Sequence, residues 1–263
     1  MLERLRLLTR ATGNPIFFRE ELARVLADEP ERLNRALNDP DCVDVLTWNV
    51  FASLDTHSDR DWLANQLAAM GLSGVRAPLR ISIWSGHRTG PLLKPSSAYL
   101  AGIRRRSSTA GASADQLGAF AAAIEVPVRI ESPEVLALVD TALARYPRGA
   151  AGRDRTLELI DAGLEHAHRL GKSLIVAAVT PAGSQAESQV AERIRQLAIP
   201  QALAQELGRE PRTSVELRQI SWQELLELWQ SSQRYLRLDR APVKAFGAHC
   251  SKVLAPQPSR RAG

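Results

Sequence analysis

A pair of β-rich segments in the middle of the chain restricts the fold more than any other feature. Residues 124–132 and 135–144 are dominated by small and branched apolar side chains, and a short turn around Pro133 separates them. Two such segments divided by a turn predict a β-hairpin. The segments that flank this hairpin then decide which kind of sheet it joins.

The residues after the hairpin predict a crossover to another strand. Apolar side chains at 157, 160, 164 and 167 follow helical spacing within residues 153–170, and Gly171 is placed to end that helix. Residues 174–180 form a continuous apolar run, which is typical of a buried strand. A strand, a helix and a strand in this order predict a mixed sheet with a crossover helix.

The other segments extend this sheet and cover it with helices. We expect one strand before the hairpin, at 79–84, and a further strand at 215–220. Residues 86–111 are rich in Gly, Pro, Ser and Arg, and they predict a long surface loop with one helical turn. Helices are expected at 20–26, 30–38, 43–54, 58–70, 185–207, 222–229 and 242–254, with Ser58 and Ser221 as N-caps.

These elements predict an α/β protein with a mixed central sheet that is flanked by helices. Residues 1–75 would form an N-terminal helical part that packs on the core, and residues 76–240 would form the α/β core. Residues 241–263 would add a C-terminal helix and a disordered basic tail.

The charge of the chain is compatible with a nucleic-acid partner. Net charge is +5 and the sequence pI is about 9.7, and nearly all of the basic residues are arginines. Arginines neutralise phosphates and release counterions, although the same excess can simply keep a protein soluble or reflect a GC-rich genome. Aromatic residues make up 5% of the chain, which argues against a surface on which bases stack.

The sequence also indicates where such a protein would reside. Cys42 and Cys250 are far apart and form no CxxC pair, so we expect reduced thiols. Residues 1–13 alternate arginine and leucine without an apolar core, and no run of about 18 apolar residues occurs elsewhere. We therefore expect a cytoplasmic protein with no membrane association.

Asp140 is the residue in the hairpin that the apolar pattern does not explain. Strand alternation places it on one face with Leu138 and Ala142, within the apolar run 135–143. A carboxylate in such a run is costly unless it is paired, bound to a metal or near the strand end. In one interpretation Asp140 bonds a local donor such as Arg145, and in the other it is a metal ligand.

Several segments between about residue 43 and residue 230 share the order of a known family. They are the hairpin from Glu125 through Glu131-Ser132 to Asp140-Thr-Ala142, a preceding helix with Leu46-Thr-Trp48-Asn-Val-Phe51, the pair Arg153-Asp154, and Ser221-Trp222 followed by Leu225-Leu226. In this order they resemble the PD-(D/E)XK restriction-endonuclease-like superfamily. The resemblance implies an αβββαβ core with additional N-terminal helices.

The resemblance also implies a chemistry that this chain carries only in part. In the family an aspartate and a glutamate hold Mg²⁺, and a lysine helps to activate water and to stabilise charge at the phosphate. The corresponding positions here are Pro127, Asp140 and Ala142. Proline cannot bind a cation and alanine carries no charge, so Asp140 is the one expected metal ligand that remains.

A rearranged site is the alternative to a lost one. Glu125 and Glu131 share a face with Pro127 and could join Asp140 as catalytic acids, but the nearer lies about 6.5 Å away along the strand. Asp44 could supply another acid. Lys94 and Arg129 are the candidates for the missing cation, although arginine is a poor proton-transfer group because it stays charged.

These observations leave three functions open. The first is a nuclease-like, DNA-associated protein of a restriction or defence system that no longer cleaves. The second is a Mg²⁺-dependent DNA endonuclease with a rearranged site, and the third is an interaction protein that retains only the fold. For DNA contacts we expect Arg129, Arg153 and the run Arg104, Arg105 and Arg106. Protein partners and a homodimer are compatible with all three.

Two weaker features predict no site. His166 and His168 are two residues apart on a helix and diverge, and none of the histidines has ligand spacing with a cysteine. Lys172 follows Gly171 but lacks the upstream glycine and the following helix of a phosphate-binding loop. We interpret that pair as the end of a helix.

Overall fold

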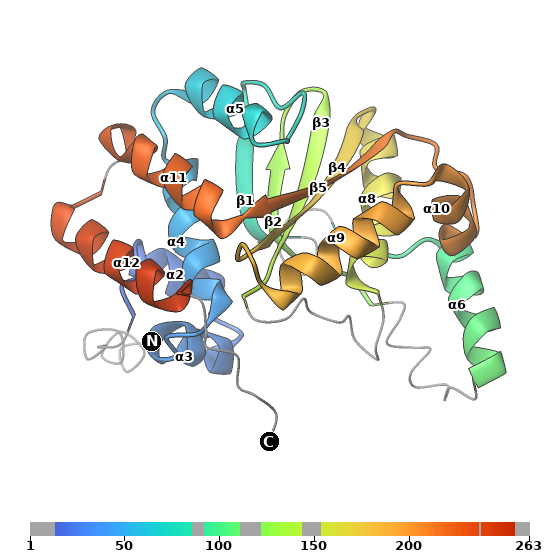
Figure 1. Ribbon diagram of the computed structural model, residues 1–263, viewed down its shortest axis with the longest axis horizontal. Coiled ribbons are helices and arrows are strands. Elements are labelled where there is room, and N and C mark those ends of the chain that lie inside the picture. The colour runs from blue at the N-terminus through green and yellow to red at the C-terminus, as the bar shows by residue number, and fades with distance from the viewer. Residues whose placement is uncertain (1–13, 86–91, 111–121, 144–153, 237, 256–263) are drawn as a thin grey trace. The chain divides into compact units, whose positions relative to one another are not determined.

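A computed structural model describes residues 14–85, 92–110, 122–143, 154–236 and 238–255 (Figure 1). The chain divides into two compact units. One contains residues 1–58 and 225–263, and the other contains residues 59–224. The domain boundaries expected at 75 and 240 stay predictions.

The first unit is helical. Its helices are α2 (Arg19–Val25), α3 (Pro30–Asn38), α4 (Val43–Asp55), the greater part of α11 (Trp222–Ser232) and α12 (Arg240–Val253). An aromatic cluster forms part of its core: Phe17 stacks on Trp229 at 5.9 Å between ring centroids, and Phe246 meets both rings edge-on. Asn49 fixes the chain beside this cluster, because its side chain accepts from the Phe17 N–H and donates to the Pro15 carbonyl.

The second unit is built on a five-stranded mixed sheet in the order β1-β2-β3-β4-β5. β1 (Arg80–Ser85), β2 (Val126–Glu131) and β3 (Val135–Thr141) are antiparallel, while β4 (Ser173–Thr180) and β5 (Val215–Ser221) run parallel to β3. The α/β class, the central mixed sheet and the N-terminal helices are therefore confirmed.

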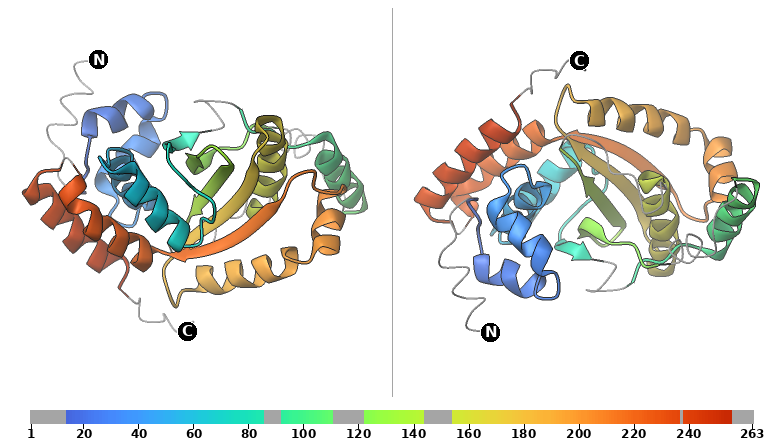
Figure 2. Two further views of the ribbon diagram at one scale, coloured as in Figure 1. Left: turned by 90° about the horizontal axis from the view of Figure 1, so that it is seen from above. Right: turned by 90° about the horizontal axis from the view of Figure 1, so that it is seen from below.

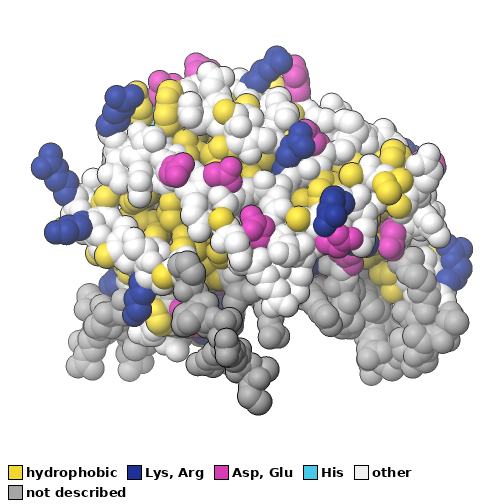
Figure 3. Space-filling model, viewed as in Figure 1, with side chains coloured by type: hydrophobic (Ala, Val, Ile, Leu, Met, Phe, Trp, Pro, Cys, Tyr) yellow, Lys and Arg dark blue, Asp and Glu magenta, His cyan; other side chains and the backbone are white. Residues whose placement is uncertain are grey.

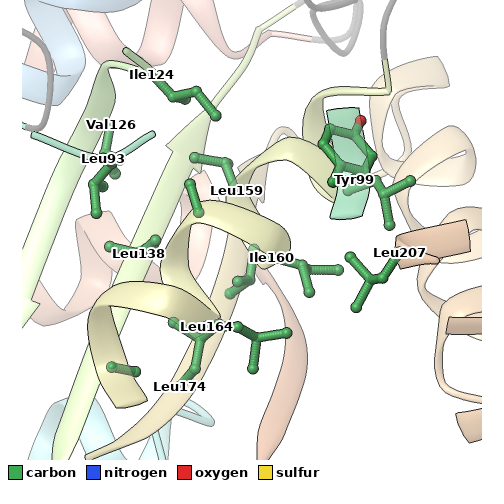
Figure 4. Close-up of a cluster of buried hydrophobic side chains, with 14 of the residues drawn as sticks. Leu93, Tyr99, Ile124, Val126, Leu138, Leu159, Ile160, Leu164, Leu174 and Leu207 are labelled. Atoms are coloured by element: carbon green, nitrogen blue, oxygen red, sulfur yellow. The ribbon is translucent and has the colours of Figure 1, made fainter. Parts of the chain in front are cut away.

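One face of this sheet is covered by helices that follow the parallel strands. α8 (Arg155–Leu170) packs on β3 and β4, and its Gly163 lets Leu138 and Leu174 approach the helix closely. α9 (Gln185–Leu197), α10 (Pro200–Leu207) and α6 (Ser97–Ala110) continue the layer (Figure 2). Leu138, Leu159, Ile160, Leu164, Leu174 and Leu207 pack together in the core of this layer (Figure 4).

The segment after α5 (Arg60–Ala69) contacts the opposite face of the sheet. Arg218 of β5 donates to the Gly71 carbonyl, and Glu216 accepts from Ser73. Near the C-terminal end of β3 the indole N–H of Trp222 donates to the Ala142 carbonyl at 2.9 Å. All seven residues of β3 are buried, so both faces of this strand are covered. This explains why its sequence is apolar at almost every position.

Two local expectations differ from the structure. Fourteen residues of the expected surface loop form α6, a full helix. The N-cap of α5 is Asp59, whose carboxylate accepts from the Trp62 N–H, and not Ser58. The expected caps at Gly171, with φ of 66°, and at Ser221, whose hydroxyl accepts from the Glu224 N–H, are confirmed.

Candidate functional site at the end of the hairpin

Asp140 lies near the C-terminal end of β3, on the face that α8 covers. The last pair of the β2–β3 register is Val128 with Val139, and one further step places Pro127 opposite Asp140. These are the two positions where the resemblance implies metal ligands. Asp140 is 2% exposed, so its carboxylate requires a partner within the protein.

That partner is Arg155, the first residue of α8. Its Nε and Nη2 lie 3.4 and 3.5 Å from the two carboxylate oxygens of Asp140, and Nη2 also donates to the Glu125 carbonyl at 2.5 Å. Asp154 caps the same helix by accepting from the Leu157 N–H, and its other oxygen pairs with Arg193. The crossover helix therefore supplies a residue opposite in sign to Asp140, while Arg145 lies outside the described residues.

Pro127 coincides with an irregularity in the sheet. β2 lies between β1 and β3, where a proline removes a ladder hydrogen bond. The β1–β2 pairs on either side are Ile83 with Val128 and Ser85 with Val126, and Trp84 between them has φ of 49°. The strand thus accommodates a proline at a place where the neighbouring strand leaves regular geometry.

Ala142 is part of the sheet framework. It is 3% exposed, its N–H donates to the Val179 carbonyl at 2.9 Å, and its carbonyl accepts from Trp222. A buried alanine held on both sides by backbone bonds packs the sheet but cannot act on a phosphate.

The structure places the three predicted acids Glu125, Glu131 and Asp44 differently. The Glu125 carbonyl accepts from Arg155, the residue that also pairs with Asp140. Glu131 pairs with Leu136 across the hairpin, four residues from Asp140, which corresponds to about 13 Å along the strand. Asp44 belongs to the other unit, where Arg32 binds both of its oxygens, at 2.7 and 3.1 Å.

The predicted cations are also dispersed. Lys94 is exposed, and its neighbour Leu93 accepts from the Ile124 N–H just before β2. Arg104 and Arg105 are exposed on α6, whereas Arg129 is buried on β2. Arg153 and the side chain of Arg106 lie outside the described residues.

These residues do not fit a resident divalent cation. Mg²⁺ binds through several oxygen ligands, and more than one carboxylate usually contributes. The Asp140 carboxylate is held by a guanidinium, with a proline on the neighbouring strand. Among the described residues no group of three or more acidic, histidine or cysteine side chains is arranged to hold a metal ion.

A second charged group occupies the other end of the hairpin, and we call it the basic cluster. It consists of Arg129, His166, Arg169 and Lys172 together with Glu131, and the charges of the other four residues all act on His166. The Glu131 oxygens accept from Arg129 Nη2 at 2.6 Å and from Lys172 Nζ at 2.7 Å. Burial raises the pKa of Glu131, but Lys172 and Arg129 outweigh that effect and lower it overall.

The sequence patterns around His166 and Lys172 predict no functional site. The signal that could have found them is their position: α8 runs antiparallel to β3, so its last turn returns to the hairpin turn where Glu131 lies. Burial, followed by the charges of Arg129 and Arg169, lowers the pKa of His166 to about 4. The imidazole is therefore neutral at pH 7.

In comparisons with protein-family models, curated proteins and solved structures, none matches this chain. Within the described residues, no helix combines the length and the apolar character that crossing a membrane requires.

Proposed function

We propose that this chain is a nuclease-like, DNA-associated protein that does not cleave DNA. The observation that carries the proposal is the pairing of Asp140 with Arg155. A guanidinium at 3.4 and 3.5 Å from the two oxygens competes directly with a divalent cation for the same ligand. Pro127 and Ala142 then leave no second acid and no lysine at the positions where the family chemistry needs them.

The order of elements supports the nuclease-like part of the proposal. Three antiparallel strands, β1, β2 and β3, with α6 inserted between β1 and β2, are followed by the crossover helix α8 and the parallel strand β4. Apart from α6, this order is compatible with the αβββαβ core that the resemblance implies. A fold of this kind is compatible with several functions, so the function has to be inferred from the chemistry at the site and from the charge of the chain.

Net charge supports the association with DNA. The chain carries +5, and arginine supplies nearly all of the basic groups. On the face shown in Figure 3, the basic side chains of the described residues are spread between acidic ones and do not form one stripe. We therefore expect weak, salt-dependent binding to duplex DNA without sequence preference.

Nicking of supercoiled plasmid in Mg²⁺ or Mn²⁺ tests the absence of cleavage. We expect no nicking above that of a heat-denatured sample. Metal-dependent nicking that Asp140→Asn abolishes would overturn the proposal and favour the rearranged endonuclease.

Binding of a fluorescent DNA duplex as a function of salt tests the association. We expect log K to fall linearly with log salt, and the double variant Arg104→Gln/Arg105→Gln to reduce the slope. Arg195→Gln, an exposed arginine on α9 paired with Glu192, is the matched control and should change neither. Affinity that does not depend on salt would favour an interaction protein.

A further inference from the structure

The basic cluster contains more positive than negative charge. Arg129 and Lys172 donate to the single carboxylate of Glu131, while Arg169 lies against His166. Two acids on the neighbouring helix and hairpin turn already have partners: Glu165 pairs with Arg209 at 3.1 Å, and Glu134 pairs with Arg76 at 3.7 Å.

A further cation lies at the edge of this cluster. Arg80 of β1 is exposed and stands directly opposite Glu131 in the β1–β2 register. The charged groups that face His166 from the strands, from α8 and from the turn after it therefore retain a net positive charge.

The deepest residues of the cluster carry donors without acceptors. Arg129 and His166 are 6% and 4% exposed, and within the described part of the chain Arg129 Nε and His166 Nε2 have no hydrogen-bond partner. Glu131 accepts from Arg129 Nη2 alone, so the Nε side of the guanidinium can still donate to another acceptor.

The tautomer of His166 follows from its neighbour. Arg169 Nη2 lies 3.4 Å from Nδ1, and a guanidinium can only donate. Nδ1 is then the acceptor, and the neutral ring carries its proton on Nε2. Leaving a buried N–H without an acceptor is costly, and two such donors beside excess positive charge are the arrangement that an anion satisfies.

We propose that the basic cluster is a binding site for one phosphate group. The N–H groups of Arg129 Nε and His166 Nε2 donate to its oxygens from the buried side. Lys172 and Arg169 neutralise its charge from the more exposed side, where Arg80 also lies. A phosphate dianion balances the excess charge of the basic cluster, since the cluster holds three cations and one carboxylate.

The low pKa of His166 supports this site. Burial, and then the charges of Arg129 and Arg169, disfavour a proton on the ring. A bound dianion would compensate these charges, so the pKa of His166 should rise when phosphate binds. The site lies at the opposite end of the hairpin from Asp140 and does not depend on whether the protein associates with DNA.

The test uses the whole chain with ¹³C-labelled histidine rings, followed by NMR during a titration with inorganic phosphate at constant ionic strength. His166→Gln identifies the His166 resonance. We expect that resonance to shift with a millimolar dissociation constant, and the pKa of His166 to rise by about one unit or more. His249, on α12 in the other unit, is the internal reference and should not respond.

Variants at the more exposed side keep the test independent of folding. Lys172→Met and Arg169→Gln should each weaken phosphate binding roughly tenfold, while Arg195→Gln should leave it unchanged. A His166 resonance that phosphate does not move, or equal binding by all three variants, would overturn the proposal.

A second titration with a short DNA duplex identifies the source of the phosphate. If DNA moves the His166 resonance and Lys172→Met weakens that effect, the group belongs to a nucleic-acid backbone. If only inorganic phosphate acts, the ligand is a free phosphate or a small phosphate ester. Loss of DNA binding alone would count against the proposed function and leave this site standing.

Discussion

Replacement of Asp140 by alanine is the most direct test of what this residue does. Asp140 is 2% exposed and is paired with Arg155, whose side chain is 16% exposed. Removing one member of a buried ion pair usually costs about 3–5 kcal/mol. Here the contacts are long, at 3.4 and 3.5 Å, and Arg155 keeps its bond to the Glu125 carbonyl. We therefore expect Asp140→Ala to lower the free energy of unfolding by about 2–3 kcal/mol.

The partner variant should cost more, because it leaves the more deeply buried charge alone. Arg155→Met removes the cation from a carboxylate that water hardly reaches, and we expect a loss of about 3–4 kcal/mol. The double variant should be more stable than the sum of the two losses implies, with a coupling free energy of about 2 kcal/mol.

Urea unfolding followed by circular dichroism measures all three values. Glu192→Gln, which removes one member of an exposed ion pair on α9, is the control and should stay within about 0.5 kcal/mol of the parent chain. A loss below about 0.5 kcal/mol for Asp140→Ala would refute the reasoning. Asp140 would then behave as a former metal ligand that folding does not require.

Three other perturbations give outcomes of known sign. The folded-state pKa of His166, about 4, lies below its ordinary 6.5, so the stability that this group contributes is present above pH 6.5. This stability is lost as the pH falls toward 4, by up to about 3 kcal/mol of the free energy of unfolding. Unfolding of His166→Gln measured as a function of pH should not show this loss. Gly171→Ala should lower the melting temperature, because an alanine at φ of 66° costs about 1 kcal/mol of stability. Gly247→Ala, in α12 with open space around it, should raise the melting temperature. Trp222→Phe should cost about 1–3 kcal/mol in chemical denaturation, because the buried Ala142 carbonyl loses its indole donor.

The strands and most helices could be predicted because their patterns are local. Continuous apolar runs and a proline turn give β2, β3 and β4, and the spacing at 157, 160, 164 and 167 gives α8. α6 was wrongly expected to be mainly loop because its sequence is polar and its neighbours contain many glycines and prolines. Tyr99 and Ile103 bury one side of this helix, a contact with α8 and α10 that no local pattern reveals.

The site was harder to predict because its partners are distant in sequence. The apolar run shows that the Asp140 carboxylate needs a partner, and one interpretation named a local donor such as Arg145, which lies outside the described residues. The donor that the structure describes, Arg155, is the first residue of α8. Likewise Lys172 reaches Glu131 across 41 positions. Pairing of this kind depends on strand register and on the rotation of α8 about its axis, and composition determines neither.

The Asp140–Arg155 pair and the basic cluster each connect the hairpin to one end of α8. Arg169 and Lys172, at the C-terminal end, are placed where the helix dipole favours cations, and Glu131 pairs with Lys172 there. Arg155 is placed at the N-terminal end, where the dipole disfavours a cation. Asp140 and the Glu125 carbonyl compensate the arginine in that position. The pair is therefore self-sufficient, and a metal ion would have to displace Arg155 into unfavourable surroundings before it could bind Asp140.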